Sequence, residues 1–126
     1  MNTKLRVLLV EDDEAIQKLT CIHLEPYATV VVAGSIRAAQ KEHEANPDFC
    51  LIILDGRVPR FDNGILTPDD TTLALAWYII NKWRIPAYSF SSDDELNDKL
   101  AKMGCIHTNK FTAVGEAKKA LIALKT

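Results

Sequence analysis

The stretch Leu5–Val10 (LRVLLV), followed by four acids at 11–14 (EDDE), decides the fold of this 126-residue chain. A short apolar run with an abrupt polar stop is typical of a strand that is buried on both faces. Apolar residues then recur at helical spacing from Ala15 to His23, with Asp13 as the expected N-cap and Pro26 as the helix end. The chain therefore begins with a strand and a helix.

The strand–helix pattern then repeats along the rest of the chain. Short apolar or β-branched runs predict strands at 29–33, 49–54, 86–90 and 105–107, and periodic apolar residues predict helices at about 35–44, 70–83, 92–103 and 112–124. Strands that alternate with helices imply a parallel sheet covered by helices on both faces. We therefore predict a single α/β domain over residues 1–126, with a doubly wound sheet of five parallel strands in a three-layer α/β/α arrangement.

Individual residues mark the ends and inner faces of these helices. Ser35, Thr67 with Pro68, and Thr112 are expected to begin the second, third and fifth helices, and Gly104 to end the fourth. The inner face of the third helix is expected to carry Leu73, Trp77, Ile80 and Trp83. That of the last helix is expected to carry Val114, Ala117, Leu121 and Leu124.

Composition excludes several classes of protein. About 48% of residues are hydrophobic and 25% are charged, which is globular rather than disordered. The 15 basic and 17 acidic residues leave a net charge of −2, so no broad basic surface is available for nucleic acid or a membrane. The apolar run near the N-terminus is too short for a signal peptide or a membrane span, which favours a cytoplasmic protein.

The three cysteines, Cys21, Cys50 and Cys105, are widely spaced and form no CxxC motif. Their odd number and spacing argue against a disulfide framework and against a zinc site. Each lies in an apolar stretch, so buried reduced thiols are expected.

Polar residues follow four of the predicted strands. Glu11 and Asp12 end the first, Asp55 the third, Ser91 the fourth, and Lys110 comes shortly after the fifth. The carboxyl ends of parallel strands meet at one sheet edge, where clustered carboxylates repel one another unless a cation such as Mg²⁺ neutralises them. Each of these features alone is also typical of a solvated helix start or an exposed lysine. Their occurrence in order at four strand ends favours a site.

These segments resemble the motifs of response-regulator receiver domains, whose flavodoxin-like (βα)5 fold agrees with the predicted one. The matching segments are VLLVEDDEAI at 7–16, LIILDGRVP at 51–59 and IPAYSFSS at 85–92, together with the Gly104 turn and Lys110. The resemblance spans the whole chain, and its first two motifs are the specific ones.

The resemblance implies a phosphoacceptor in a two-component phosphorelay. Asp55 would accept a phosphoryl group from a phosphohistidine of a sensor histidine kinase or a phosphotransfer protein. Glu11, Asp12, Asp55 and the backbone carbonyl of Arg57 would bind Mg²⁺. Ser91 and Lys110 would contact the phosphoryl oxygens. Such a chain is a signalling protein that catalyses only its own phosphorylation and dephosphorylation.

Further roles follow from the resemblance. Arg57 and Asp93, two residues past Asp55 and Ser91, would tune the lifetime of the phosphoryl group. His107 stands at the place of the family's switch aromatic, and is expected either to switch or to be a partly buried histidine without that duty. The face formed by the fourth strand, fourth helix and fifth strand would contact a partner or a second copy, through Trp83, Tyr88, His107 and Phe111. For Trp83, packing at its helix end is the alternative.

The sequence also departs from the family pattern. The loop after Asp55 is longer than usual, so the third helix is expected to start late. Phe111 follows Lys110 where the family has proline after a cis bond, and a trans peptide is therefore expected. The segment from Gly104 to Lys110 is one residue shorter than is typical.

These departures keep two other functions open. One is a degenerate receiver that acts as a phosphorylation-independent interaction module. The other is a small α/β enzyme or flavodoxin-like cofactor binder, which the lack of a Gly-rich phosphate loop, GxSxG or HExxH motif disfavours. In each signalling interpretation the five strand–helix units use the whole chain, so the output is expected from a partner.

Overall fold

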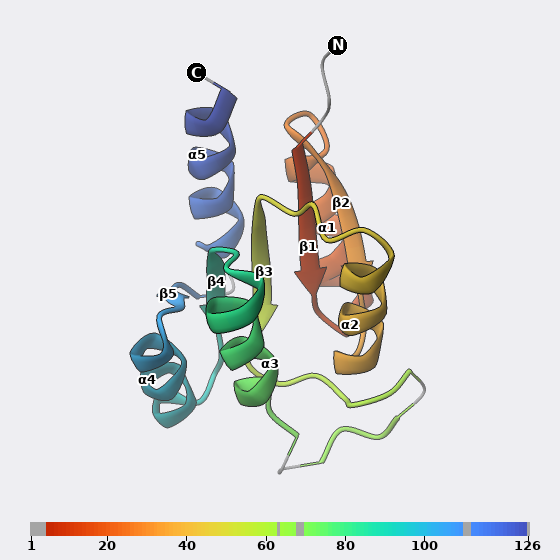
Figure 1. The fold of residues 1–126 in the computed structure, drawn as a ribbon, viewed down its shortest axis with the longest axis vertical. Coiled ribbons are helices and arrows are strands. Elements are labelled where there is room, and N and C mark those ends of the chain that lie inside the picture. The colour runs from red at the N-terminus through yellow and green to blue at the C-terminus, as the bar shows by residue number, and fades with distance from the viewer. Residues whose placement is uncertain (1–4, 63, 68–69, 110–111, 126) are drawn as a thin grey trace.

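A computed structural model describes residues 5–62, 64–67, 70–109 and 112–125 of the chain. Its described strands form one parallel sheet in the order β2-β1-β3-β4-β5 (Figure 1). The strands are β1 (Leu5–Val10), β2 (Ala28–Ala33), β3 (Leu51–Asp55), β4 (Ala87–Phe90) and β5 (Ile106–His107). The predicted doubly wound α/β sheet is confirmed.

The helices cover both faces of this sheet. They are α1 (Glu14–Leu24), α2 (Ile36–Ala45), α3 (Leu73–Tyr78) with a π-helical turn η1 (Ile79–Trp83), α4 (Asp94–Met103) and α5 (Ala113–Lys125). Alternate residues along β1 point to opposite faces. Leu8 and Val10 pack in the core under α2, α3 and α4, whereas Val7 and Leu9 pack in the core under α1 and α5. The chain changes faces between β1 and β3, which places a topological switch point between the carboxyl ends of these strands.

The predicted helix ends are largely confirmed. Oδ1 of Asp13 accepts hydrogen bonds from the backbone of Ala15 and Ile16 at 2.9 and 3.2 Å, and Ser35 caps α2. Gly104 ends α4 with φ of 110°, a left-handed conformation that favours glycine.

The third helix differs from its prediction. It begins at Leu73 instead of near Asp70, in line with the expected late start, and Thr67 does not cap it. The residue before it, Thr72, is bonded to the end of β3, so the helix begins where the chain is attached to that strand. The buried side is formed by Leu75, Ala76 and Ile79. The predicted inner position of Trp77 is wrong, because this side chain is 44% exposed, while Leu73, Ile80 and Trp83 are half-buried.

Smaller differences concern α5 and the cysteines. Thr112 directly precedes α5 as predicted, but its hydroxyl accepts a hydrogen bond from the backbone N–H of Asn109 at 3.1 Å. Leu124 is exposed instead of packed. All three thiols are free, and Cys105 is buried, whereas Cys21 and Cys50 are only half-buried. Within the described segments, the longest and most apolar helices still fall short of what a membrane crossing requires.

Candidate functional site

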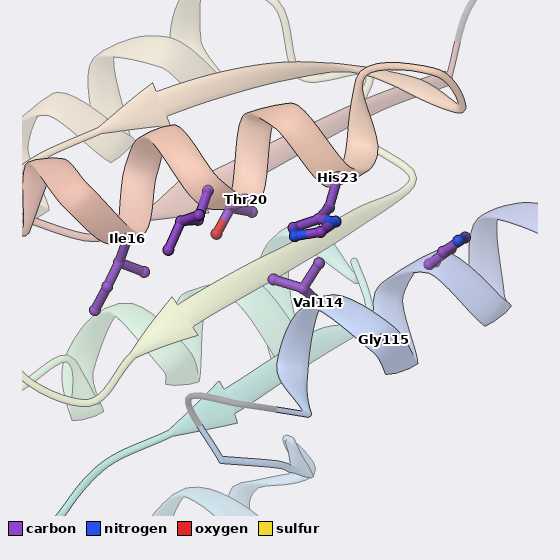
Figure 2. A pocket seen from close by; sticks show the side chains of 7 residues that line it. Ile16, Thr20, His23, Val114 and Gly115 are labelled. Carbon is purple, nitrogen blue, oxygen red and sulfur yellow. The ribbon is translucent and has the colours of Figure 1, made fainter.

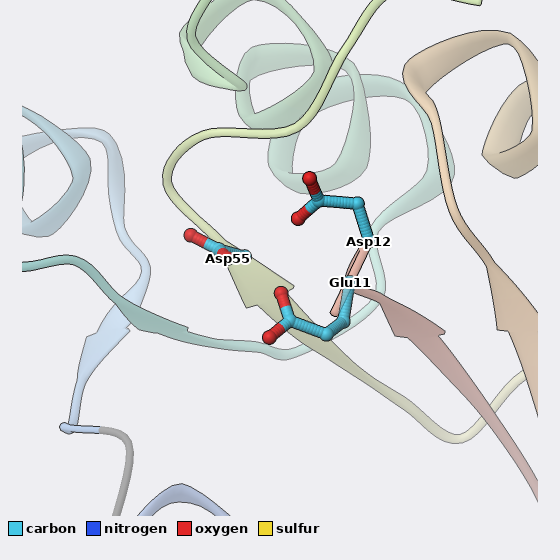
Figure 3. Close-up of side chains that lie close together, drawn as sticks. All are labelled: Glu11, Asp12 and Asp55. Atoms are coloured by element: carbon cyan, nitrogen blue, oxygen red, sulfur yellow. The ribbon is translucent and has the colours of Figure 1, made fainter. Parts of the chain in front are cut away.

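Three carboxylates converge at the switch point of the sheet. Glu11 and Asp12 follow β1, and Asp55 ends β3, which pairs with β1 in the register Val10↔Leu54. One carboxylate oxygen from each of the three lies within 4.8 Å of the other two (Figure 3). Glu11 is buried, Asp55 is half-buried and Asp12 is exposed. The predicted meeting of these acids at one edge is confirmed.

The donor set of this cluster suits a hard divalent cation. Carboxylate oxygens are the ligands that Mg²⁺ prefers, and the exposed side of the cluster leaves room for water ligands. Carboxylates this close repel one another in the absence of a cation. Glu11, Asp12 and Asp55 therefore fit a magnesium site by their chemistry and placement.

Backbone contacts hold Asp55 in position. Its Oδ1 accepts a hydrogen bond from the backbone N–H of Arg57 at 3.0 Å, and its carbonyl accepts one from Oγ1 of Thr72 at 2.8 Å. The backbone N–H of Thr72 also donates to the carbonyl of Gly56 at 2.9 Å. Thr72 is fully buried and ties the start of α3 to the end of β3. The role of Thr72 was not predicted from the sequence. The feature that could have indicated it is a threonine directly before a helix.

Ser91 lies across the same cavity. A cavity of about 320 Å³ is lined by Glu11, Asp12, Asp13, Asp55, Arg57, Leu66, Ser91 and Ser92. The hydroxyl of Ser91 accepts a hydrogen bond from the backbone N–H of Asp93 at 3.1 Å, and its carbonyl accepts one from Asn97 at 2.8 Å. The predicted meeting of Ser91 with the acids is thus found.

Close approach of β3 to β4 at this edge requires Gly56. A Cβ at this position would lie 2.9 Å from both the Cβ of Ser91 and Cδ2 of Leu96. The backbone N–H of Gly56 donates to the carbonyl of Phe90 at 2.8 Å, which extends the β3–β4 pairing by one step. The short distance between the ends of β3 and β4, which carry Asp55 and lead to Ser91, is therefore possible because residue 56 is a glycine.

The two predicted tuning residues are bound to each other. Arg57 forms an ion pair of 3.1 Å with Oδ2 of Asp93, and its guanidinium also donates to the carbonyl of Asp70 at 3.5 Å. Oδ1 of Asp93 caps α4. The pKa of Asp93 is lowered, foremost by the hydrogen bond from the backbone N–H of Leu96 and next by the one from Arg57.

Other predicted residues lie away from this arrangement. His107 is exposed on β5, so its interpretation as a partly buried histidine is wrong. Trp83 is half-buried and stacks on His43 of α2 with ring centroids 3.8 Å apart, which confirms helix-end packing and excludes it from the face of β4, α4 and β5. Tyr88 is half-buried against the core under α1 and α5. Lys110 and Phe111 lie outside the described residues.

A larger cavity, of about 540 Å³, lies between α1 and α5. Figure 2 shows Ile16, Thr20 and His23 on one side and Val114 and Gly115 on the other. None of the three clustered acids lines this cavity. The smaller cavity is the one that brings the chemically active side chains together.

Comparison with known proteins gives one kind of match. No protein-family model and no curated protein matches the chain. Among solved structures, a CheY-like response regulator receiver domain from Methanospirillum hungatei superposes with a TM-score of 0.74 at 19% identity, covering 98% of each chain. The chain has the receiver fold.

Further receiver domains support this result. A signal receiver domain from Vibrio parahaemolyticus matches with a TM-score of 0.72 at 21% identity, over 97% of this chain and 89% of that one. The BeF3-activated receiver domain of Klebsiella pneumoniae RstA matches with a TM-score of 0.71 at 23% identity, over 92% of this chain and 96% of that one. The resemblance predicted from the motifs is therefore supported at the level of the fold.

Proposed function

We propose that this chain is a phosphoacceptor receiver domain, in which Asp55 accepts a phosphoryl group from a histidine kinase or a phosphotransfer protein. One observation carries the proposal. Glu11, Asp12 and Asp55 converge at the carboxyl edge of a receiver fold, and Ser91 lines the same cavity. The chain would act as a signalling protein in the cytoplasm rather than as an enzyme with an external substrate.

The chemistry is a phosphoryl transfer in which the protein mainly positions groups and balances charge. A carboxylate oxygen of Asp55 attacks the phosphorus of a phosphohistidine. The P–N bond breaks, its electron pair returns to the imidazole, and an acyl phosphate forms on Asp55. The hydroxyl of Ser91 would donate to a phosphoryl oxygen, and Lys110 would pair with another. Mg²⁺ held by Glu11, Asp12, Asp55 and the carbonyl of Arg57 would neutralise phosphoryl charge.

A small phosphodonor tests this proposal. Wild type incubated with Mg²⁺ and acetyl phosphate is expected to form an acid-labile adduct that peptide mapping places on Asp55. Asp55→Asn and Asp55→Ala are expected to form none, whereas Asp98→Asn, which changes an exposed acid on α4, retains the adduct. An unmodified wild type, or a modified Asp55→Ala, would contradict the proposal.

The loop between β3 and α3 favours one second candidate, an interaction module that works without phosphorylation. Phe61 and Ile65 in this loop are 63% and 87% exposed, so both can make apolar contacts with a partner. If the chain is such a module, wild type and Asp55→Asn would bind the partner with the same affinity. Loss of partner binding in Asp55→Asn would exclude it.

The face of β4, α4 and β5 is proposed as the surface that contacts a partner or a second copy after phosphorylation. Ile106 and His107 on β5 are both exposed there. Sedimentation of the wild type and of Ile106→Ala, each with and without a phosphoryl mimic, tests this surface. Equal association of wild type and Ile106→Ala would argue against this surface. His107→Ala tests the switch role separately: if its association still changes with the phosphoryl mimic as in wild type, His107 is not the switch.

A further inference from the structure

The cavity that holds Asp55 has one apolar wall. Among the described residues that line it, Leu66 is the only apolar side chain, and the others are acids, serines and Arg57. Leu66 lies in the loop between β3 and α3 and belongs to neither hydrophobic core. It is 44% exposed, whereas its neighbour Ile65 is 87% exposed. Core packing therefore does not account for the position of Leu66.

Contacts with α2 and its cap hold the first half of this loop. The carbonyl of Pro59 accepts a hydrogen bond from the backbone N–H of Ile36 at 3.0 Å. The hydroxyl of Ser35 donates to Oδ1 of Asp62 at 3.0 Å. Both bonds join the first half of the loop to the start of α2.

A buried acid holds the second half of the loop. Oδ2 of Asp70 accepts a hydrogen bond from the backbone N–H of Thr67 at 2.9 Å, and its Oδ1 forms an ion pair of 3.3 Å with Arg60. Asp70 is only 7% exposed. These contacts hold Thr67, the residue next to Leu66, and the leucine side chain lines the cavity beside it.

We propose that Leu66 limits the access of water to the acyl phosphate on Asp55 and so sets its lifetime, an inference that rests on the proposed function. In hydrolysis a water oxygen attacks the phosphorus, the bond from phosphorus to the Asp55 oxygen breaks, and the carboxylate leaves with the electron pair. Inorganic phosphate is released and a proton passes to solvent. An apolar wall offers water no hydrogen bond on the side that it covers, which protects a reactive intermediate.

The test is the decay of the phosphorylated protein after the phosphodonor is removed, with Mg²⁺ held constant. Leu66→Ala and Leu66→Ser are expected to lose the phosphoryl group about threefold to tenfold faster than wild type. Leu66→Met, which keeps an apolar side chain of similar volume, is expected to retain the wild-type lifetime. Ile65→Ala is the matched control, because Ile65 is the adjacent apolar residue and does not line the cavity.

The outcomes separate this inference from the proposed function. Equal lifetimes in Leu66→Ala, Ile65→Ala and wild type would overturn the role of Leu66 while leaving the phosphoacceptor intact. Faster decay in Ile65→Ala as well would also overturn it, since a general loosening of the loop would then be the cause. A wild type that takes up no phosphoryl group would overturn both. Thermal unfolding of each variant shows whether the fold is retained.

Discussion

The guanidinium of Arg57 lies 3.1 Å from Oδ2 of Asp93, while Oδ1 of the same carboxylate accepts hydrogen bonds from the backbone of Glu95 and Leu96. One side chain therefore caps α4 and links that cap to the residue two positions past Asp55. Since Arg57 also donates its backbone N–H to Asp55, the end of β3 and the start of α4 are joined through a short chain of contacts.

The two roles of Asp93 can be separated by mutation. Asp93→Ala removes the cap and the ion pair, and Asp93→Asn keeps a capping oxygen. Arg57→Ala removes the pair and the bond from the guanidinium to the carbonyl of Asp70, and it leaves the cap in place. The pair is partly exposed and screened by solvent, so we expect Asp93→Ala to lower the free energy of unfolding more than either other variant. Urea denaturation measures this order. Equal losses in Asp93→Ala and Arg57→Ala would show that the cap contributes little.

The lowered pKa of Asp93 predicts how stability depends on pH. A carboxyl whose pKa is lower in the folded state binds protons more readily when unfolded, so its contribution is complete above the unfolded pKa of about 3.9. That contribution is lost as pH falls through the folded value. The stability difference between wild type and Asp93→Asn should be constant above about pH 5 and shrink below about pH 4. Urea titrations across this range check it, and a difference independent of pH would contradict it.

Two glycines give opposite predictions for the same substitution. A Cβ on Gly56 would lie 2.9 Å from Ser91 and Leu96, so Gly56→Ala should force the ends of β3 and β4 apart and reduce phosphorylation of Asp55. Gly115 lies in α5, and apart from its chain neighbours and the nearby backbone of its own helix no atom lies within 4 Å of an added Cβ. Gly115→Ala should therefore raise the free energy of unfolding by about 0.5–1 kcal/mol and leave phosphorylation unchanged.

Both glycine variants are measured by thermal unfolding and by the yield of the Asp55 adduct. A fully phosphorylated Gly56→Ala would show that the edge of the sheet adapts to the added methyl group. A destabilised Gly115→Ala would indicate that α5 is more crowded than its open surroundings suggest.

The sequence predicted the sheet well because its signal is local. The apolar runs of β1 and β3 stop at acids, and parallel strands bring their carboxyl ends together, so Glu11, Asp12 and Asp55 could be placed at one edge from order alone. Caps at Asp13 and Ser35 could be predicted for the same reason, since each contacts its own helix.

Features that depend on contacts between distant segments could not be predicted. The bond from Thr72 to the carbonyl of Asp55 joins residues on opposite sides of a long loop, and α3 follows this attachment directly, with Trp77 exposed. Thr67, next to Leu66, is bonded to Asp70, which in turn pairs with Arg60 from the other half of that loop. Trp83 packs on His43 because α2 lies beside the end of η1, a relationship that helical periodicity does not contain.

The acid cluster predicts a crossing of stabilities when Mg²⁺ is added. Without a divalent cation, the three carboxylates within 4.8 Å repel one another, so Glu11→Gln or Asp12→Asn should unfold at a higher temperature than wild type in EDTA. Mg²⁺ should stabilise the wild type more than either variant. At a Mg²⁺ concentration about a hundred times the dissociation constant, the free energy of unfolding of the wild type should rise by about 2.7 kcal/mol. Asp98→Asn, far from the cluster in sequence, should gain as much as wild type. Thermal unfolding with EDTA and across a Mg²⁺ series measures both effects, and a wild type that Mg²⁺ does not stabilise would show that these acids hold no cation.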